Sequence, residues 1–362
     1  MLKKIKNFKW RQLRPRRWWQ WLLYLIAVLT ILMYTAKWWN PLIFPPVKDP
    51  EFGVSFSIKQ ADIFGLDWKK NYLALLDDMD IKHYRLMSYW DMYEQEPGKY
   101  DFSSLDWQIN QAAKHHADVS LAIGLRQPRW PECHQPDWAA KLKQTDKLKW
   151  KQSLEKYISV VVKRYEHNPA VISWQLENEA LNNWFGECGP AQRQRIIEEY
   201  KLVKSISDKP VWMSLSDQHG LPIGQPWPDE FGFSVYRTVW NEKIGPVEGY
   251  ITYPTPIWYH NLRRTVIKLY TGRDSFVHEL QLEPWGPTGT VNLSVEEQNK
   301  SMDLDQIHEN LLFARELGMK RIYVWGGEWW YWRKVNGDPS VWNKVKAEMG
   351  PYIQKEINAR QL

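Results

Sequence analysis

Cysteine is scarce in this sequence, which has only two such residues, Cys133 and Cys188, among 362. The two can form a disulfide if the domain is exported, and two free thiols are the alternative. No Gly-x-Gly-x-x-Gly motif follows the first apolar run, which counts against a dinucleotide-binding fold. The histidines lack the spacing of metal ligands, so we expect no catalytic metal and no cofactor; they include His83, His115, His116 and His167.

Acidic residues are absent from the first 40 positions, which carry nine Lys or Arg. The other 322 residues carry 39 basic and 42 acidic side chains, although the whole chain has a net charge of +6. Because the basic excess belongs to the N-terminal arm, it does not indicate a domain that binds nucleic acid.

Residues 18–36 form a run without charge between Arg17 and Lys37, with tryptophans near both ends. As a helix the run spans roughly 28 Å, close to the hydrocarbon thickness of a bilayer. We therefore predict a transmembrane anchor here, with residues 1–17 as a basic cytoplasmic arm and the rest of the chain on the non-cytoplasmic side. A cleaved signal peptide and a buried core helix are the alternatives, but no good cleavage site follows the run.

Residues 37–52 are a short Pro-rich linker, and residues 53–362 then alternate apolar runs with helical patterns. Eight such units predict a (β/α)8 TIM barrel, with a doubly wound sheet as the alternative. The segment between the fifth and sixth runs is short and rich in Pro and Gly, so we expect no full helix there. The eight predicted strands are Gly53–Ser57, His83–Met87, Val119–Gly124, Val171–Leu176, Val211–Leu215, Phe231–Tyr236, Phe276–Glu279 and Ile322–Trp325.

Carboxylates stand at the ends of two strands that lie opposite each other in such a barrel. The fourth strand ends in Glu177-Asn178-Glu179, and the seventh contains Glu279. Cleavage of a glycosidic bond needs one carboxyl group to protonate the leaving oxygen and a second to attack the anomeric carbon or activate water. Tryptophan (24) and tyrosine (18) are also frequent, and flat rings stack on the apolar faces of sugars.

These features resemble the signature of clan A of the glycoside hydrolases, over about residues 53–350. Asn178-Glu179 and Glu279 carry the resemblance, together with Arg85 on the second strand and Trp325 on the eighth. Three further stretches match, and they are Tyr89-Trp90, Glu96-Pro-Gly-Lys-Tyr-Asp-Phe102 and Gly124-Leu-Arg-Gln-Pro-Arg-Trp-Pro131.

The resemblance implies a retaining mechanism in which Glu179 is the acid/base and Glu279 the nucleophile. It also implies that Asn178 binds the sugar 2-hydroxyl and that Arg85 and Tyr236 orient the nucleophile. Trp325 would lie under the reacting sugar, and further candidates for sugar contact on the same face are Trp90, Trp285 and Glu328. The implied partner is a carbohydrate, with a lipid bilayer contacted by residues 18–36.

Several alternatives stay open at this point. Glu283, four residues after Glu279, is a second candidate nucleophile, and Glu177 is a rival to Glu179. Cys133 and Cys188 follow neighbouring strands, so a disulfide between their loops is expected. A transglycosylase of the same fold and a non-catalytic glycan-binding protein are competing functions. The sugar, the linkage, endo or exo action and the oligomeric state are not assigned.

Overall fold

A computed structural model describes residues 18–43, 45, 47–183, 185–215, 220–242 and 249–360 of the chain. It divides into two compact units, Met1–Pro45 and Pro46–Leu362. The predicted basic arm, residues 1–17, lies outside the described residues.

Among the described residues of the first unit is helix α1 (Trp18–Ile43), which covers the predicted anchor and continues into the predicted linker. Apolar side chains along it, such as Leu22 and Ile31, are exposed. None of the helices in the described residues combines the length and apolar character that crossing a bilayer requires. The transmembrane anchor therefore stays a prediction.

The second unit is built on a closed barrel of eight parallel strands, in the order β1-β10-β9-β6-β5-β4-β3-β2. This confirms the (β/α)8 fold expected from the eight apolar runs. The barrel strands are β1 (Glu51–Ser55), β2 (His83–Met87), β3 (Asp118–Ile123), β4 (Val171–Leu176), β5 (Val211–Ser214), β6 (Glu230–Val235), β9 (Asp274–Leu280) and β10 (Arg321–Val324).

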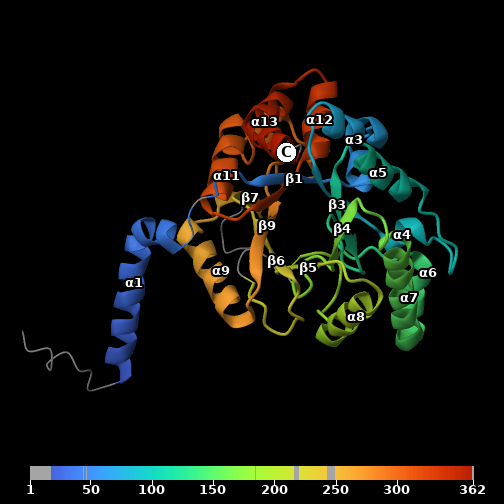
Figure 1. Ribbon diagram of the computed structural model, residues 1–362, viewed down its shortest axis with the longest axis horizontal. Helices are drawn as coiled ribbons and strands as arrows, with labels where there is room; N and C mark the ends of the chain where they lie inside the picture. The colour runs from blue at the N-terminus through green and yellow to red at the C-terminus, as the bar shows by residue number, and fades with distance from the viewer. Residues whose placement is uncertain are drawn as a thin grey trace, which may run out of the picture. The chain divides into compact units, whose positions relative to one another are not determined.

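Helices surround these strands (Figure 1). The described residues between β5 and β6 contain no helix, as the Pro- and Gly-rich composition predicts. The helices are α2 (Ile58–Ile63), α3 (Trp68–Asp77), α4 (Trp90–Tyr93), α5 (Ser103–Lys114), α6 (Asp137–Thr145), α7 (Lys147–Tyr165), α8 (Arg193–Ile206), α9 (Ile257–Thr271), α10 (Val295–Asn299), α11 (Leu304–Glu316), α12 (Gly327–Val335) and α13 (Ser340–Arg360), with a 3-10 turn at η3 (Thr290–Asn292).

A hairpin that the sequence did not suggest follows β6. Its strands, β7 (Thr238–Asn241) and β8 (Gly249–Thr252), pair antiparallel outside the barrel. The hairpin occupies the start of the long connection between β6 and α9, on the side of the barrel where the strands end.

Several helix ends have the expected capping residues. The side chains of Asp67 and Asp303 accept backbone hydrogen bonds at the starts of α3 and α11. Gly272 ends α9 with a φ of 72°, a left-handed conformation that costs glycine little.

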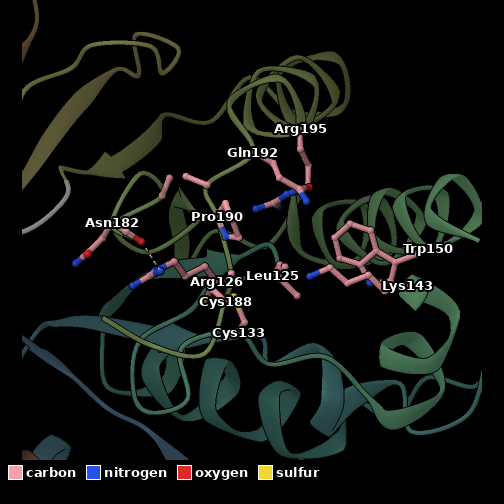
Figure 2. A pocket seen from close by; sticks show the side chains of 13 residues that line it. Leu125, Arg126, Cys133, Lys143, Trp150, Asn182, Cys188, Pro190, Gln192 and Arg195 are labelled. Atoms are coloured by element: carbon pink, nitrogen blue, oxygen red, sulfur yellow. Dashed lines mark hydrogen bonds between the residues drawn. A yellow bond between two sulfur atoms is a disulfide. The ribbon is translucent and has the colours of Figure 1, made fainter. Parts of the chain in front are cut away.

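The two cysteines form a disulfide that links the loop after β3 to the loop after β4. Their Cα atoms are 5.2 Å apart, and 55 residues separate Cys133 from Cys188 in the chain. Figure 2 shows this link beside a pocket that both loops line. The disulfide therefore holds together the two loops that flank the end of β4.

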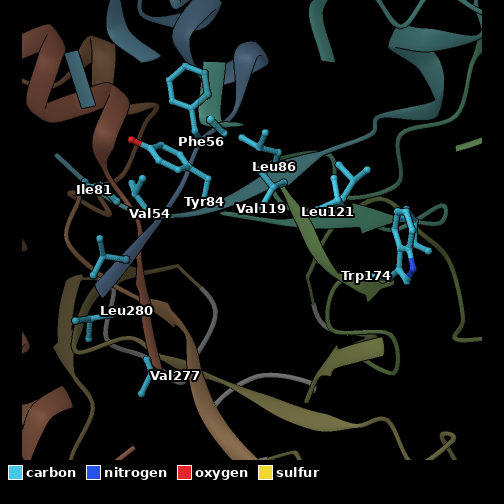
Figure 3. Packing of buried hydrophobic residues seen from close by; sticks show 14 of the residues in the cluster. Val54, Phe56, Ile81, Tyr84, Leu86, Val119, Leu121, Trp174, Val277 and Leu280 are labelled. Carbon is cyan, nitrogen blue, oxygen red and sulfur yellow. The ribbon is translucent and has the colours of Figure 1, made fainter. Parts of the chain in front are cut away.

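Apolar side chains fill the layer between strands and helices because they alternate along each strand. On β3, for example, Val119 and Leu121 are fully buried in the main core, and Trp174 of β4 joins them (Figure 3). The intervening residues face the inside of the barrel, where Arg85 of β2 donates a hydrogen bond to Gln175 of β4 across the intervening β3.

An irregularity in β9 changes which of its side chains face the barrel mouth. Phe233 of β6 pairs with Val277, but the next β6 residue, Ser234, pairs with Glu279. The register with β10 shifts over the same residues. One extra residue in a strand reverses the side of the sheet to which the following side chains point. The bulge therefore changes the direction of the Glu279 side chain.

Candidate active site

The fourth barrel strand, β4, is followed by two glutamates with different surroundings. Glu177 accepts hydrogen bonds from the backbone N–H groups of Leu125 at 2.6 Å and Arg126 at 3.1 Å. The Arg195 guanidinium pairs with the same carboxylate at 2.8 Å. These donors saturate Glu177 and fix the loop after β3, so the geometry favours Glu179 over Glu177 as the acid/base.

Glu179 is held by hydrogen bonds from neutral side chains, and these leave its carboxyl group free to exchange a proton. Its carboxylate accepts hydrogen bonds from Ser234 Oγ and Asn182 Nδ2, both at 2.7 Å. Its backbone has a φ of 42°, and its N–H donates to Ser214 Oγ at 2.7 Å. A non-glycine residue in this left-handed region costs free energy, and such residues cluster at active sites; Glu177 beside it has a φ of 53° as well.

Glu279 is oriented by one cation and one hydroxyl group. Its Oε1 accepts a hydrogen bond from Arg85 Nη1 at 2.8 Å, and its Oε2 accepts one from Tyr236 OH at 3.0 Å. Arg85 and Glu279 are both almost completely buried. The structure thus brings together the three residues that the sequence assigned to the nucleophile and its supports.

The two carboxyl groups, of Glu179 and Glu279, have different electrostatic surroundings. Burial and the negative charge of Glu279 raise the pKa of Glu179 to about 7. Glu279 has the positive charge of Arg85 beside it. Burial raises the pKa of Tyr236 well above its ordinary value, so its hydroxyl keeps the proton that it donates to Glu279. A carboxyl group with a raised pKa close to a second one that is paired with a cation is the arrangement that an acid and a nucleophile require.

Glu283, the alternative nucleophile, has a different partner. It forms an ion pair with Arg129, whose Nη2 is also 3.2 Å from Glu328. Glu328 accepts a second hydrogen bond from the backbone N–H of Ser57 at 2.5 Å. We call Arg129, Glu283 and Glu328 the mouth bridge, because they join the segments that follow β3, β9 and β10. The contacts of Glu283 therefore favour Glu279 as the nucleophile.

Glu328 lies within this bridge and not at an open sugar-binding surface. Its side chain is fully buried, and burial raises its pKa to about 7. Its predicted role as a sugar ligand stays a prediction, since both described hydrogen bonds to its carboxylate come from the protein.

Trp325, the predicted sugar platform, lies beside two guanidinium groups. The Arg85 carbon is 5.4 Å from its ring centroid and the Arg129 carbon is 4.2 Å away. The indole N–H is buried and has no hydrogen-bond partner. Trp325 is therefore next to the residue that orients Glu279, and its contact with the sugar stays a prediction.

Trp285 lies at the rim of the same region. Its half-buried ring is 5.4 Å from that of Tyr236 and 5.6 Å from that of Phe185. An aromatic surface thus begins next to the hydroxyl group that contacts Glu279.

Trp90 is the predicted sugar contact that the structure contradicts. It is fully buried, and its ring stacks on Tyr157. Its indole N–H donates to Glu94 at 2.6 Å. Trp90 begins α4 and packs into the core there, so it cannot reach a substrate without unfolding this helix.

Asn178 is positioned by neighbours that the sequence did not single out. Its Oδ1 accepts hydrogen bonds from Arg85 at 2.8 Å and Gln175 at 3.2 Å, and its Nδ2 donates to Glu132 at 3.0 Å. Burial raises the pKa of Glu132 to about 8. Glu132 is therefore a third carboxyl group in the site, and its pKa is raised above the ordinary value for glutamate.

The residues missed from the sequence came from loops and from polar positions of the barrel strands. Glu132 adjoins both the matched stretch after β3 and Cys133, which was the one available signal. Within the described residues, no group of three or more His, Cys, Asp or Glu is arranged to hold a metal ion. The other missed residues are Asn182, Ser214, Ser234 and Gln175.

A family model described as beta-galactosidase (Glyco_hydro_42) matches residues 67–210, which contain β2 to β4 and Glu179. The chain has the barrel fold of the clan A glycoside hydrolases. The beta-galactosidase BgaH of Haloferax lucentense is 22% identical over 156 residues, which are 38% of this chain and 24% of that protein. The beta-galactosidase LacZ of Lactobacillus acidophilus is 24% identical over 134 residues, 33% of this chain and 20% of that protein. The chain thus spans a quarter or less of the length of these relatives.

Solved structures share the barrel at low sequence identity. A GH5_18 structure from Streptomyces cattleya has a TM-score of 0.53 at 11% identity and covers 76% of this chain and 70% of that one. A beta-galactosidase from Marinomonas ef1 has a TM-score of 0.51 at 12% identity and covers 76% of this chain and 53% of that one. These likenesses concern the fold, and the family match together with the two relatives supports a glycosidase.

Proposed function

We propose that this protein is a retaining glycoside hydrolase that cleaves O-glycosidic bonds by double displacement. The observation that carries the proposal is the pair of buried glutamates at the ends of β4 and β9. Arg85 and Tyr236 hold Glu279, while burial and the charge of Glu279 raise the pKa of Glu179. A cation-paired carboxyl group opposite one with a raised pKa suits the two steps of a retaining glycosidase.

In the first step, a Glu279 oxygen attacks the anomeric carbon while Glu179 gives its proton to the departing glycosidic oxygen. A covalent glycosyl–enzyme ester forms, and the aglycone leaves as an alcohol. In the second step, Glu179 takes a proton from water, whose oxygen attacks the same carbon and releases Glu279. Each step inverts the anomeric centre, so the two together retain its configuration.

The remaining residues orient these groups. Arg85 donates to both Glu279 and Asn178, so one guanidinium fixes the nucleophile and the amide expected to bind the 2-hydroxyl group. Trp325 and Trp285 are proposed to contact the sugar through their rings. The proposed substrates are β-linked hexosides. Among these we place β-galactosides first, because the matching relatives are named beta-galactosidases.

The test is a hydrolysis panel with the purified full chain. Aryl β-galactoside, β-mannoside and β-glucoside would be compared with the α-galactoside, and the first-formed product would be followed by proton NMR. We expect turnover of a β-glycoside with the β-anomer of the free sugar appearing first. Appearance of the α-anomer first would contradict double displacement. In a parallel reaction with an added sugar acceptor, a new product that contains the acceptor would indicate transglycosylation.

The pH dependence follows from the raised pKa of Glu179. A carboxyl group with a pKa of about 7 holds its proton below that pH and loses it above. We therefore expect kcat/KM for substrates with poor leaving groups to fall with rising pH, with a midpoint near 7. A profile from about pH 5 to about pH 9 measures this decline, which should be absent in Glu179→Gln. A midpoint near the ordinary glutamate value of about 4.3 would contradict the assigned role.

We further propose that the barrel acts outside the cytoplasm, tethered to a lipid bilayer by residues 18–36. The basic residues before this run and the disulfide between Cys133 and Cys188 support the proposal, because disulfides persist in oxidising compartments. In cells, we expect the chain in the membrane fraction, with its cysteines labelled by a maleimide only after reduction. A soluble chain with freely labelled thiols would contradict this placement.

A further inference from the structure

Glu132 is a carboxyl group of the site to which the proposed chemistry assigns no role. It lies on the loop after β3, next to Cys133, and 3% of its surface is exposed. Asn178 and Glu279 are exposed to the same extent. The burial of Glu132 therefore does not distinguish it from the groups that are expected to contact substrate.

The backbone around Glu132 is held from several directions. Its φ is 72°, its N–H donates to the Arg129 carbonyl at 2.7 Å, and its carbonyl accepts from the Gln127 N–H at 2.8 Å. Gly186, on the loop after β4, packs so closely that a Cβ there would lie 2.7 Å from the Glu132 Cβ. The disulfide at Cys133 joins the same two loops. Left-handed backbone in a non-glycine residue costs free energy, and such residues cluster where proteins bind ligands.

The carboxyl group that this backbone supports is directed at Asn178. Its Oε2 accepts a hydrogen bond from Asn178 Nδ2 at 3.0 Å and lies 3.6 Å from Arg126 Nε. Burial raises the pKa of Glu132, and the negative charges of Glu179 and Glu279 add to the rise. Glu132 therefore lies within electrostatic reach of both proposed catalytic groups.

Asn178 can bind a sugar hydroxyl only as a donor. Its Oδ1 already accepts from Arg85 Nη2 at 2.8 Å, and from Gln175 Nε2 and Ser214 Oγ, both at 3.2 Å. An amide oxygen has two lone pairs, and an amide nitrogen carries two protons. One proton on Nδ2 is bonded to Glu132, so the other is available to substrate.

Glu132 supplies a second hydrogen-bonding group beside this donor. Among the described residues, hydrogen bonds reach only its Oε2, and its Oε1 is not fully enclosed by protein atoms. Oε1 can accept from a hydroxyl group when the carboxyl group is ionised and can donate to it when protonated. A hydroxyl group that both accepts and donates can thus bond to Asn178 and Glu132 together.

We propose that Glu132 is a substrate-binding residue that contacts, together with Asn178, one hydroxyl group of the reacting sugar. Because Asn178 is expected to bind the 2-hydroxyl group, Glu132 selects sugars in which this hydroxyl is present and free. A site built to bond a hydroxyl rejects the analogue that lacks it, since its buried polar groups are then left unpaired. The inference rests on the proposed glycosidase function and names a group of the substrate that the site recognises.

The test compares the best aryl glycoside of the panel with its 2-deoxy analogue, using the full chain. We expect the unaltered protein to prefer the 2-hydroxy substrate by about 10²-fold or more in kcat/KM. Glu132→Ala should lose about 10–100-fold on the 2-hydroxy substrate and less than about threefold on the analogue. Glu132→Gln, which keeps the shape and can still bond to both groups, should recover most of the preference.

The matched control is Glu187→Ala, which removes an exposed carboxylate from the loop that packs against Glu132. The Glu187 N–H donates to the Pro131 carbonyl at 3.0 Å, and this backbone contact survives the substitution. The control should therefore keep the full preference for the 2-hydroxy substrate. An equal fold loss on both substrates in Glu132→Ala would indicate a structural role alone and overturn the proposal.

Calorimetry gives a second readout that needs no turnover. Methyl β-thioglycosides of the three panel sugars resist hydrolysis, and each is compared with its 2-deoxy analogue. We expect Glu132→Ala to weaken binding of the 2-hydroxy ligand about tenfold or more and to leave the analogue unchanged. This result in a chain that hydrolyses no glycoside would refute the proposed function and support the role of Glu132. Hydrolysis with an unchanged preference in Glu132→Ala would do the reverse, and absence of both binding and hydrolysis would overturn both.

Discussion

Replacing Glu279 with Gln is expected to lower kcat on every glycoside substrate by roughly 10⁴-fold or more. The amide cannot form the glycosyl ester, and removal of the nucleophile from other covalent enzymes costs losses of about this size or larger. Thermal unfolding should show a folded protein, because Arg85 retains its contacts with Gln175 and Asn178.

The matched control is Glu283→Gln, which alters the other candidate on the same segment. Glu283 contacts Arg129 in the mouth bridge, so this variant should lose stability but keep kcat within about tenfold of the parent. A 2-fluoro glycoside would trap the ester, and mass spectrometry of the peptides would locate it. Trapping on Glu283, or in the Glu279→Gln variant, would refute the assignment of Glu279.

Replacing Glu179 with Gln should produce a loss that depends on the leaving group. Substrates that need protonation of the departing oxygen should slow by about 10²–10⁴-fold, the usual range for a general acid. Activated aryl glycosides should lose much less in the first step, and added azide, which needs no general base, should restore turnover as a glycosyl azide. The measurement is kcat/KM over a series of aryl glycosides of rising phenol pKa.

Glu177→Gln is the informative comparison for this variant. Glu177 pairs with Arg195 and accepts from the loop after β3, so its loss should lower the unfolding midpoint. Any change in rate should then be the same for good and poor leaving groups. An equal loss on both kinds of substrate in Glu179→Gln would instead remove the acid role from Glu179.

Much of the fold followed from the sequence because short apolar runs and helical patterns alternate along it. Eight such runs, among them Val119–Gly124, predict the eight strands of a (β/α)8 barrel. The order of strands then placed Glu179 and Glu279 at the same mouth. That inference needs only the topology and no loop geometry.

The choice between Glu279 and Glu283 depends on contacts that only the structure shows. Glu279 contacts Arg85 and Tyr236, whereas Glu283 pairs with Arg129, and no residue pattern in the segment predicts this difference. Trp90 was misplaced for a related reason, since a tryptophan after a strand can turn outward to substrate or inward to the core. Glu132 and Asn182 lie on loops, where spacing along the chain says little about position.

The mouth bridge constrains which substitutions are tolerated at its three positions in related sequences. Loss of Arg129 alone would leave the partly buried Glu283 and the fully buried Glu328 without the cation that they share, and loss of either acid alone would leave the cation undercompensated. Positions 129, 283 and 328 should therefore vary together among homologues, all three charged or all three neutral. An alignment of homologues should therefore show covariation among these three positions, although they lie far apart in the sequence.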